Sequence, residues 1–182
     1  MFGKNRFLAQ VESSWDRLYR LAYSWTHDTH LSRDLVQETI SRAIVKRKQL
    51  KNMEALDAWL FRILSNCWYD VCRQNKYLRE LPEMEEPVTN ETPETDRYRQ
   101  EVINKVQRAI IRLPMEQRQI VTLVDLEGFS YSEVADIVNV PIGTVMSRLC
   151  RARNKLKIYL NEMDTQNNSN GEPHGDNVRR IR

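Results

Sequence analysis

Apolar residues recur at intervals of three and four along most of the chain, and this spacing predicts helices. Three such stripes, one for each of three predicted helices, fall within the first 80 residues: Leu18, Leu21, Ala22 and Trp25; Val36, Ile40, Ala43 and Ile44; and Trp59, Leu60, Ile63, Leu64 and Cys67. There is no alternating run of β-branched residues that would favour a sheet. The pattern predicts an all-α protein whose first 80 residues form a small helical bundle.

A second helical region lies at residues 131–157, where the spacing fits two short helices joined by a tight turn. Ala135 is small enough for the helices to cross closely, and Asn139 tolerates the positive φ that such a turn demands. Pro141 cannot continue the first helix but suits the start of the second, whose core residue is Val145. This spacing predicts a helix-turn-helix.

The second of these helices has an apolar face and a basic polar face. The apolar face carries Val145, Leu149, Ala152 and Leu156, and the polar face carries Thr144, Ser147, Arg148 and Arg151. Residues 143–157 hold five basic side chains and no acidic one. Arg pairs bidentately with guanine in the major groove, so the polar face is predicted to contact DNA. A solvated amphipathic helix would have the same charges but does not explain the spacing of the turn.

Charge and composition divide the chain into segments. Residues 1–80 carry 14 Lys and Arg against 9 Asp and Glu, residues 81–100 carry 2 against 6, and residues 101–162 carry 9 against 7. The acidic segment has three Pro and no helical stripe, so it is predicted to be a flexible linker. Residues 163–182 are polar and are predicted to be a disordered tail. We therefore expect two small helical domains, 1–80 and 101–162.

Aromatic and basic side chains alternate along the third helix and beyond it, at Trp59, Phe61, Arg62, Trp68, Tyr69, Arg73, Lys76, Tyr77 and Arg79. Aromatic rings stack on unpaired bases while Lys and Arg follow the phosphates, so this mixture suits single-stranded nucleic acid. The alternative is that the tryptophans, Trp59 and Trp68, are simply buried.

Candidate chemistry is sparse. Three cysteines form no disulfide framework and are interpreted as reduced, packed thiols, and His27 and His30 lack further residues at metal-ligand spacing. Neither a catalytic triad pattern nor a Gly-rich phosphate loop is present, so we expect no enzyme, cofactor or metal. The absence of a long apolar stretch and of a signal-peptide core predicts a cytoplasmic protein.

Three segments together resemble the extracytoplasmic-function group (group IV) of bacterial sigma factors. WLFRILSNCWYDVCRQ (59–74) looks like the promoter-melting helix, and RDLVQETISRA (33–43) looks like the segment that grips the polymerase clamp helices. Residues 113–153 look like the domain that reads the upstream promoter element. The three motifs occur in the family's order and cover roughly residues 8–160.

The resemblance assigns an expected role to each segment. The domains would be sigma region 2 (1–80) and sigma region 4 (101–162), with the acidic linker threading the polymerase's nucleic-acid channel. Polymerase contacts would come from Asp34, Gln37 and Glu38. The minus-ten element would be captured and melted by Lys51, Asn52, Met53, Asn66, Asp70 and Arg73. The minus-thirty-five element would be read by Thr144, Met146, Ser147, Arg148, Arg151 and Arg153.

The resemblance also implies partners. A monomer would bind core RNA polymerase and promoter DNA, and an anti-sigma factor, often membrane-bound in this group, would hold it silent. Met146, Cys150 and Gln74 depart from common residues of the group, which leaves the promoter sequence open. The rival hypothesis is a stand-alone helix-turn-helix regulator, which would bind duplex DNA by itself, usually as a dimer.

Overall fold

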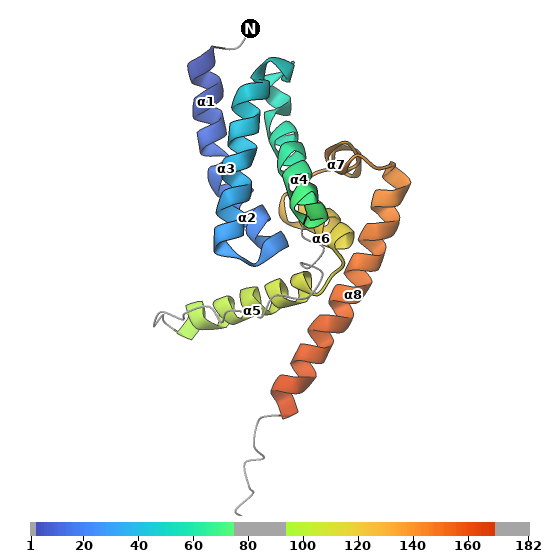
Figure 1. The fold of residues 1–182 in the computed structure, drawn as a ribbon. Coiled ribbons are helices and arrows are strands. Elements are labelled where there is room, and N and C mark those ends of the chain that lie inside the picture. Colours follow the sequence, from blue (N-terminus) through green and yellow to red (C-terminus); the bar gives the residue numbers. More distant parts are fainter. Residues whose placement is uncertain (1–2, 75–93, 170–182) are drawn as a thin grey trace, which may run out of the picture.

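The computed structural model describes residues 3–74 and 94–169, and every regular element within these ranges is helical (Figure 1). In chain order the elements are α1 (Lys4–Ser13), α2 (Trp15–Thr26), α3 (Thr29–Lys46), the short 3-10 helices η1 (Arg47–Gln49) and η2 (Met53–Ala55), α4 (Leu56–Gln74), α5 (Glu94–Ile111), α6 (Met115–Val121), the π-helical turn η4 (Thr122–Leu126), α7 (Tyr131–Val138) and α8 (Ile142–Ser169). The all-α prediction is confirmed. In these two ranges no helix has the length and hydropathy that crossing a bilayer requires.

The N-terminal half, residues 3–74, is a bundle in which α3 packs against α2 and α4. The first and third predicted stripes lie in its core, apart from Trp59, which is half-buried. The second stripe is wrong at one position, because Ile44 is 43% exposed while Leu35 is buried. On α3 the buried face is centred on Leu35, Val36, Thr39 and Ala43. Ile44, one residue and about 100° past Ala43, turns away from that face.

The C-terminal half, residues 94–169, contains α5 to α8. Here α5 begins at Glu94 and α8 continues to Ser169, so residues 94–100 and 163–169 are helical rather than linker and disordered tail. Ion pairs join the far end of α8 to α5, between Lys105 and Asp164 and between Arg112 and Glu162. The Lys105–Asp164 pair holds the helix against α5 just beyond the predicted domain end at residue 162. The remaining linker residues, 81–93, and the tail residues 170–182 lie outside the described ranges.

The two halves share one hydrophobic core. The helix α4 lies between α3 and α7 (Figure 1), and α2 contacts α5, α6 and η4. The buried residues of both halves form a single continuous cluster that runs from Phe7 to Ala152. Two separate small cores were expected from the sequence, and instead the halves bury apolar surface against each other.

Candidate nucleic-acid and polymerase interface

The helix-turn-helix is formed by α7, a left-handed turn and α8. Ser130 starts α7 with a capping box, in which its hydroxyl accepts a hydrogen bond from the Glu133 backbone N–H and the Glu133 carboxylate accepts from the Ser130 N–H at 2.8 Å. Asn139 ends α7 with a φ of 53°, which confirms the positive φ predicted for this position. The Pro141 carbonyl then accepts the first helical hydrogen bond of α8, from the Thr144 N–H at 2.8 Å.

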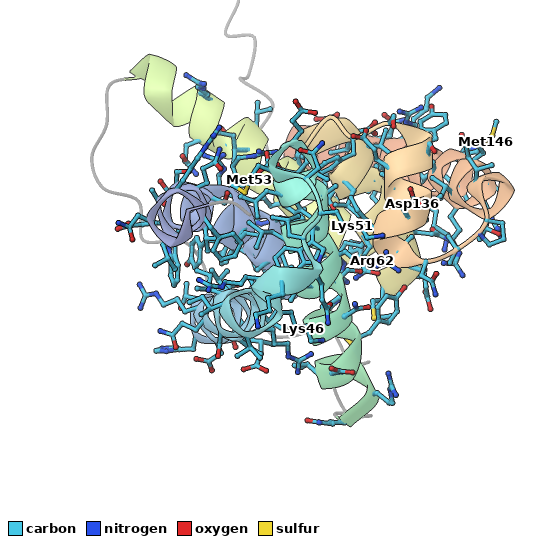
Figure 2. All side chains as sticks on the ribbon, turned by 90° about the horizontal axis from the view of Figure 1, so that it is seen from above. Lys46, Lys51, Met53, Arg62, Asp136 and Met146 are labelled. Carbon is cyan, nitrogen blue, oxygen red and sulfur yellow. The ribbon has the colours of Figure 1, made fainter. Side chains whose placement is uncertain are left out.

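The faces of α8 are arranged as predicted. Its apolar residues Val145, Leu149 and Ala152 are at most 2% exposed, which fixes the helix on its own half. On the opposite side Ser147 and Arg151 are exposed, as is Met146, which lies at the outer edge of the C-terminal half in Figure 2. Thr144 and Arg148 are half-buried. The N-terminal turns of α8 thus present a polar surface of the size that enters a major groove.

Arg151 and Arg153 already have partners within the C-terminal half. The Arg153 guanidinium donates two hydrogen bonds to the Asp125 carboxylate, at 2.6 and 3.1 Å. Arg151 donates to the backbone oxygen and the hydroxyl of Ser147, one turn earlier on α8, at 3.2 and 3.3 Å. A bidentate pair fixes both side chains, so Arg153 must leave Asp125 before it can contact DNA. Arg151 stays on the exposed face, where it is directed along the helix.

The predicted minus-ten residues are split between a loop and α4. Lys51 and Asn52 are exposed, and Asn52 caps η2 by accepting from the Glu54 N–H at 3.0 Å. Met53, next to Asn52, is only 8% exposed and packs into the bundle core. In this arrangement it anchors the loop to the core and does not face a ligand. On α4, Asn66 and Arg73 are exposed and Asp70 is half-buried. A helix brings residues four apart to one face, so Asn66 and Asp70 are neighbours there.

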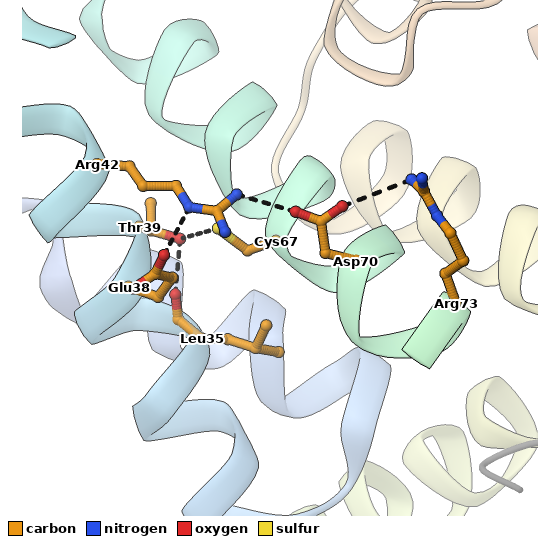
Figure 3. Close-up of polar contacts among 7 residues, drawn as sticks. All are labelled: Leu35, Glu38, Thr39, Arg42, Cys67, Asp70 and Arg73. Carbon is orange, nitrogen blue, oxygen red and sulfur yellow. Dashed lines mark hydrogen bonds and ion pairs between the residues drawn. The ribbon is translucent and has the colours of Figure 1, made fainter. Parts of the chain in front are cut away.

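The predicted polymerase contacts lie together on α3. Asp34, Gln37 and Glu38 are all exposed, on the face opposite the buried residues of that helix. Figure 3 shows that Glu38 is joined through Arg42 to Asp70 of α4, so the polymerase and minus-ten candidates meet in one polar network. The sequence motif does not single out Arg42, because its role depends on the packing of α3 against α4.

The stacking role predicted for the aromatics of α4 is wrong for two of them in this structure. Phe61 is 1% exposed and Trp68 is 5% exposed. Phe61 packs edge-on against Phe129 of the C-terminal half, with ring centroids 5.1 Å apart, and Trp59 is half-buried against Phe7 of α1. Apolar residues cover more than one side of α4 because both halves pack on it. Lys76, Tyr77 and Arg79 lie outside the described residues.

Buried polar contacts fasten the two halves together. The Trp25 indole N–H donates to the Thr122 hydroxyl at 2.8 Å, and the Gln119 amide donates to the Ser65 hydroxyl at 3.4 Å. Arg118 donates to the backbone oxygen of Trp25 in the N-terminal half. The same guanidinium also donates to backbone oxygens where α5 ends, at Ile111 and Leu113. Burial lowers the pKa of Arg118 to about 10, so the side chain stays charged at neutral pH.

An ion pair extends the contact between the halves to the surface. Arg17 of α2 binds Asp57 of α4 and Glu127, which follows η4, with an Arg17 Nη2–Glu127 Oε2 distance of 3.1 Å. Its guanidinium also lies over the Phe61 ring, 5.3 Å from the centroid. The interface between the halves therefore combines an apolar centre with charged groups at its rim, and sequence reasoning identified none of these polar residues.

Arg148 of the predicted minus-thirty-five surface contacts Tyr69 of α4, a neighbour of the predicted minus-ten residues Asn66 and Asp70. Burial raises the pKa of the Tyr69 hydroxyl, and the Arg148 guanidinium, which hydrogen-bonds it, acts in the opposite direction. Tyr69 lies between Asn66 and Asp70 on α4, and Arg148 is on the polar face of α8. In this arrangement, therefore, the half-buried Arg148 is not fully open to a ligand.

The structure gives the thiols no special reactivity. Burial raises the pKa of Cys67 and raises that of Cys72 to about 11, so both are protonated at neutral pH. The three cysteines are all free. In residues 3–74 and 94–169 no group of three His, Cys, Asp or Glu side chains is placed to hold a metal ion.

Comparison with known proteins gives matches over both halves. Residues 11–77 match the family Sigma-70 region 2, and residues 103–156 match Sigma-70, region 4. The chain is 37% identical over 154 residues to the ECF RNA polymerase sigma factor SigE of Mycolicibacterium smegmatis, covering 82% of this chain and 60% of that protein. It is 33% identical over 150 residues to the ECF RNA polymerase sigma factor SigM of Mycobacterium tuberculosis, covering 82% of this chain and 74% of that protein.

A solved structure is similar over nearly the same length. The sigma factor RpoE, in complex with the anti-sigma factor NepR from Bartonella quintana, has a TM-score of 0.68 and 28% identity, covering 86% of this chain and 97% of that one. Together with the sequence matches, this similarity favours the sigma-factor interpretation over a stand-alone helix-turn-helix regulator.

Proposed function

Because the chain belongs to the extracytoplasmic-function (ECF) RNA polymerase sigma factors, we propose that it binds core RNA polymerase and directs it to initiate at a specific set of promoters. The observation that carries the proposal is that region 2 and region 4 segments occur in one chain, each with an exposed polar face on a rigid helix. The α3 face supplies the polymerase contacts, α4 and the preceding loop take the minus-ten element, and α8 takes the minus-thirty-five element.

The proposal extends to partners and setting. The chain acts as a group IV factor, as a monomer in the cytoplasm, with no catalytic activity of its own. An anti-sigma factor, anchored in the membrane or soluble, holds it inactive by covering the surfaces that polymerase needs. The similarity to RpoE supports this, since RpoE was solved in complex with an anti-sigma factor.

Abortive transcription by core RNA polymerase, with and without the protein, tests the proposal directly. The template is a pool of randomised promoters, and the initiated templates are sequenced. We expect selective initiation that depends on the protein and yields two sequence elements upstream of the start site. No initiation, together with tight binding of the protein alone to duplex DNA, would contradict the proposal.

Asp34→Arg should weaken association with core polymerase, because it places a repulsive charge in a complementary interface. Asp34 is exposed on α3, so the change should leave the fold intact. We expect an affinity loss of about tenfold or more, measured by fluorescence titration with labelled core. Glu12→Arg, the same change of charge at an exposed position on α1, is the matched control and should bind normally. Equal affinities for the two variants would remove Asp34 from the interface.

Arg148→Ala should cost about 1–3 kcal/mol in binding of the upstream element while leaving polymerase association unchanged, because a bidentate contact to a base edge is lost. The measurement compares holoenzyme affinity for the selected promoter with affinity for the same promoter carrying a scrambled minus-thirty-five element. An equal loss on both templates would assign Arg148 to a phosphate contact instead.

A further inference from the structure

A chain of four charged side chains links α3 to α4 at the surface. Arg42 of α3 donates from Nε to Glu38 Oε1 at 2.6 Å and from Nη1 to Asp70 Oδ2 at 3.0 Å (Figure 3). The other oxygen of Asp70, Oδ1, faces Arg73 Nη2 at 3.5 Å, the limit of a hydrogen bond. The two carboxylate oxygens of Asp70 are therefore unequal, since one is held firmly and the other only weakly.

A buried contact between α3 and α4 lies next to this network. Thr39, one turn from Arg42, is fully buried, and its hydroxyl donates to the Leu35 carbonyl at 2.7 Å and approaches the Cys67 sulfur at 3.8 Å. Cys67 in turn lies one turn before Asp70 on α4 and is 2% exposed. This contact packs α3 against α4 where Arg42 and Asp70 face each other.

Stability alone does not explain the arrangement. The Arg42 side chain is 34% exposed and that of Asp70 is 42% exposed, and ion pairs at such sites contribute little to the free energy of unfolding. Arg73 cannot hold the Asp70 carboxylate as Arg42 does, because the Arg73 side chain is 79% exposed and little packed. Of these two cations that contact Asp70, Arg42 is therefore the closer and the less exposed.

A carboxylate on a DNA-binding surface has a cost and a use. Its cost is repulsion from phosphates, which a paired cation offsets. Its use is that an ionised carboxylate only accepts hydrogen bonds, so it favours a base edge that presents an N–H donor at the contacted position and disfavours one that presents an acceptor there. Both effects require that the charge be compensated and that one oxygen stay available.

We infer that Arg42 is a positioning residue for base selection in the minus-ten element: it neutralises Asp70, holds Oδ2 and leaves Oδ1 to accept from the amino group of an unpaired base. The inference rests on the proposed function, since it assigns Asp70 to the captured strand. Glu38, on the predicted polymerase-binding face, accepts a hydrogen bond from the same Arg42 guanidinium. Glu38 therefore also supports the orientation of Asp70.

The test uses holoenzyme assembled from core polymerase and the full chain, with fluorescent single-stranded oligonucleotides that carry each of the four bases at the captured minus-ten positions. Arg42→Gln should lower the ratio of affinities between the preferred and the disfavoured base about tenfold. Its affinity for core polymerase should remain within about twofold of the wild type, and Arg42→Lys should restore part of the ratio. The midpoint of thermal unfolding should move by no more than about 4 °C, because both side chains are partly exposed.

Two further variants separate positioning from simple charge. Asp70→Ala should lose the same discrimination as Arg42→Gln, and the double variant should lose no more, because the two residues act as one unit. Arg73→Gln should weaken binding to all four oligonucleotides equally and leave the ratio unchanged. Additive losses in the double variant, or an unchanged ratio in Arg42→Gln, would overturn the inference. If the wild-type protein neither binds core nor discriminates bases, the proposed function itself fails, so the two failures are distinguishable.

Discussion

Cross-linking position 17 to position 127 should abolish promoter-directed initiation by this protein. Arg17 and Glu127 belong to different halves and are joined by an ion pair in the structure, so a short bismaleimide can bridge them after Arg17→Cys and Glu127→Cys. Cys72 and Cys150, which are accessible to the reagent, would first be replaced by Ser. We expect initiation in the abortive-transcription assay to fall by on the order of a hundredfold, because the binding-competent state is no longer populated.

The reason is the separation of the two promoter elements. Sites centred about 10 and about 35 base pairs upstream of the start are roughly 25 base pairs apart, or about 85 Å along B-DNA. Arg148 of the predicted minus-thirty-five surface instead contacts Tyr69 of α4, the helix that carries three of the predicted minus-ten residues. If the predicted surfaces read the two elements, the halves must separate before both elements are bound at once.

A cross-link within one half is the matched control for this experiment. Lys105 and Asp164 join α5 to α8 and both belong to the C-terminal half. The variant with cysteines at positions 105 and 164, treated with the same reagent, should initiate like the uncross-linked protein. Full activity of the protein cross-linked between positions 17 and 127 would show that the arrangement described here is compatible with promoter binding.

Arg118→Ala should destabilise the free protein by about 3 kcal/mol or more. The substitution leaves three backbone oxygens without their donor, at Trp25, Ile111 and Leu113, and removes the link between the ends of α2 and α5. Urea unfolding at neutral pH measures the change in the free energy of unfolding. Arg112→Ala, which removes an exposed ion pair with Glu162, is the matched control and should cost about 1 kcal/mol or less.

A second substitution separates the lost hydrogen bonds from the lost packing. Arg118→Met keeps most of the side-chain volume but supplies no donor, so we expect it to remain clearly destabilised relative to the wild type. If Arg118→Met is as stable as the wild type, the guanidinium acts through its methylene groups and the carbonyl contacts contribute little.

The sequence was most informative where local chemistry decides the structure. The positive φ at Asn139 follows from a turn that few residues tolerate, and the faces of α8 follow from a spacing of three and four residues. The capping box at Ser130 and Glu133 also has a local signature, Ser-x-x-Glu before an apolar run. The breadth of apolar residues on α4, which includes Phe61 and Trp68, was the available signal that this helix is covered on more than one side.

The family and the all-α class were therefore determined by the sequence alone, because helix periodicity, turn residues and motif order are properties of short segments. Only the tertiary structure decided that the halves share one core, that Phe61 and Met53 face inward, and that Arg118 and Arg42 each join separate helices. A periodic stripe shows which face of a helix is buried but not what covers it. Contacts between residues far apart in the chain depend on the complementarity of whole surfaces, and that complementarity arises only after the helices have packed.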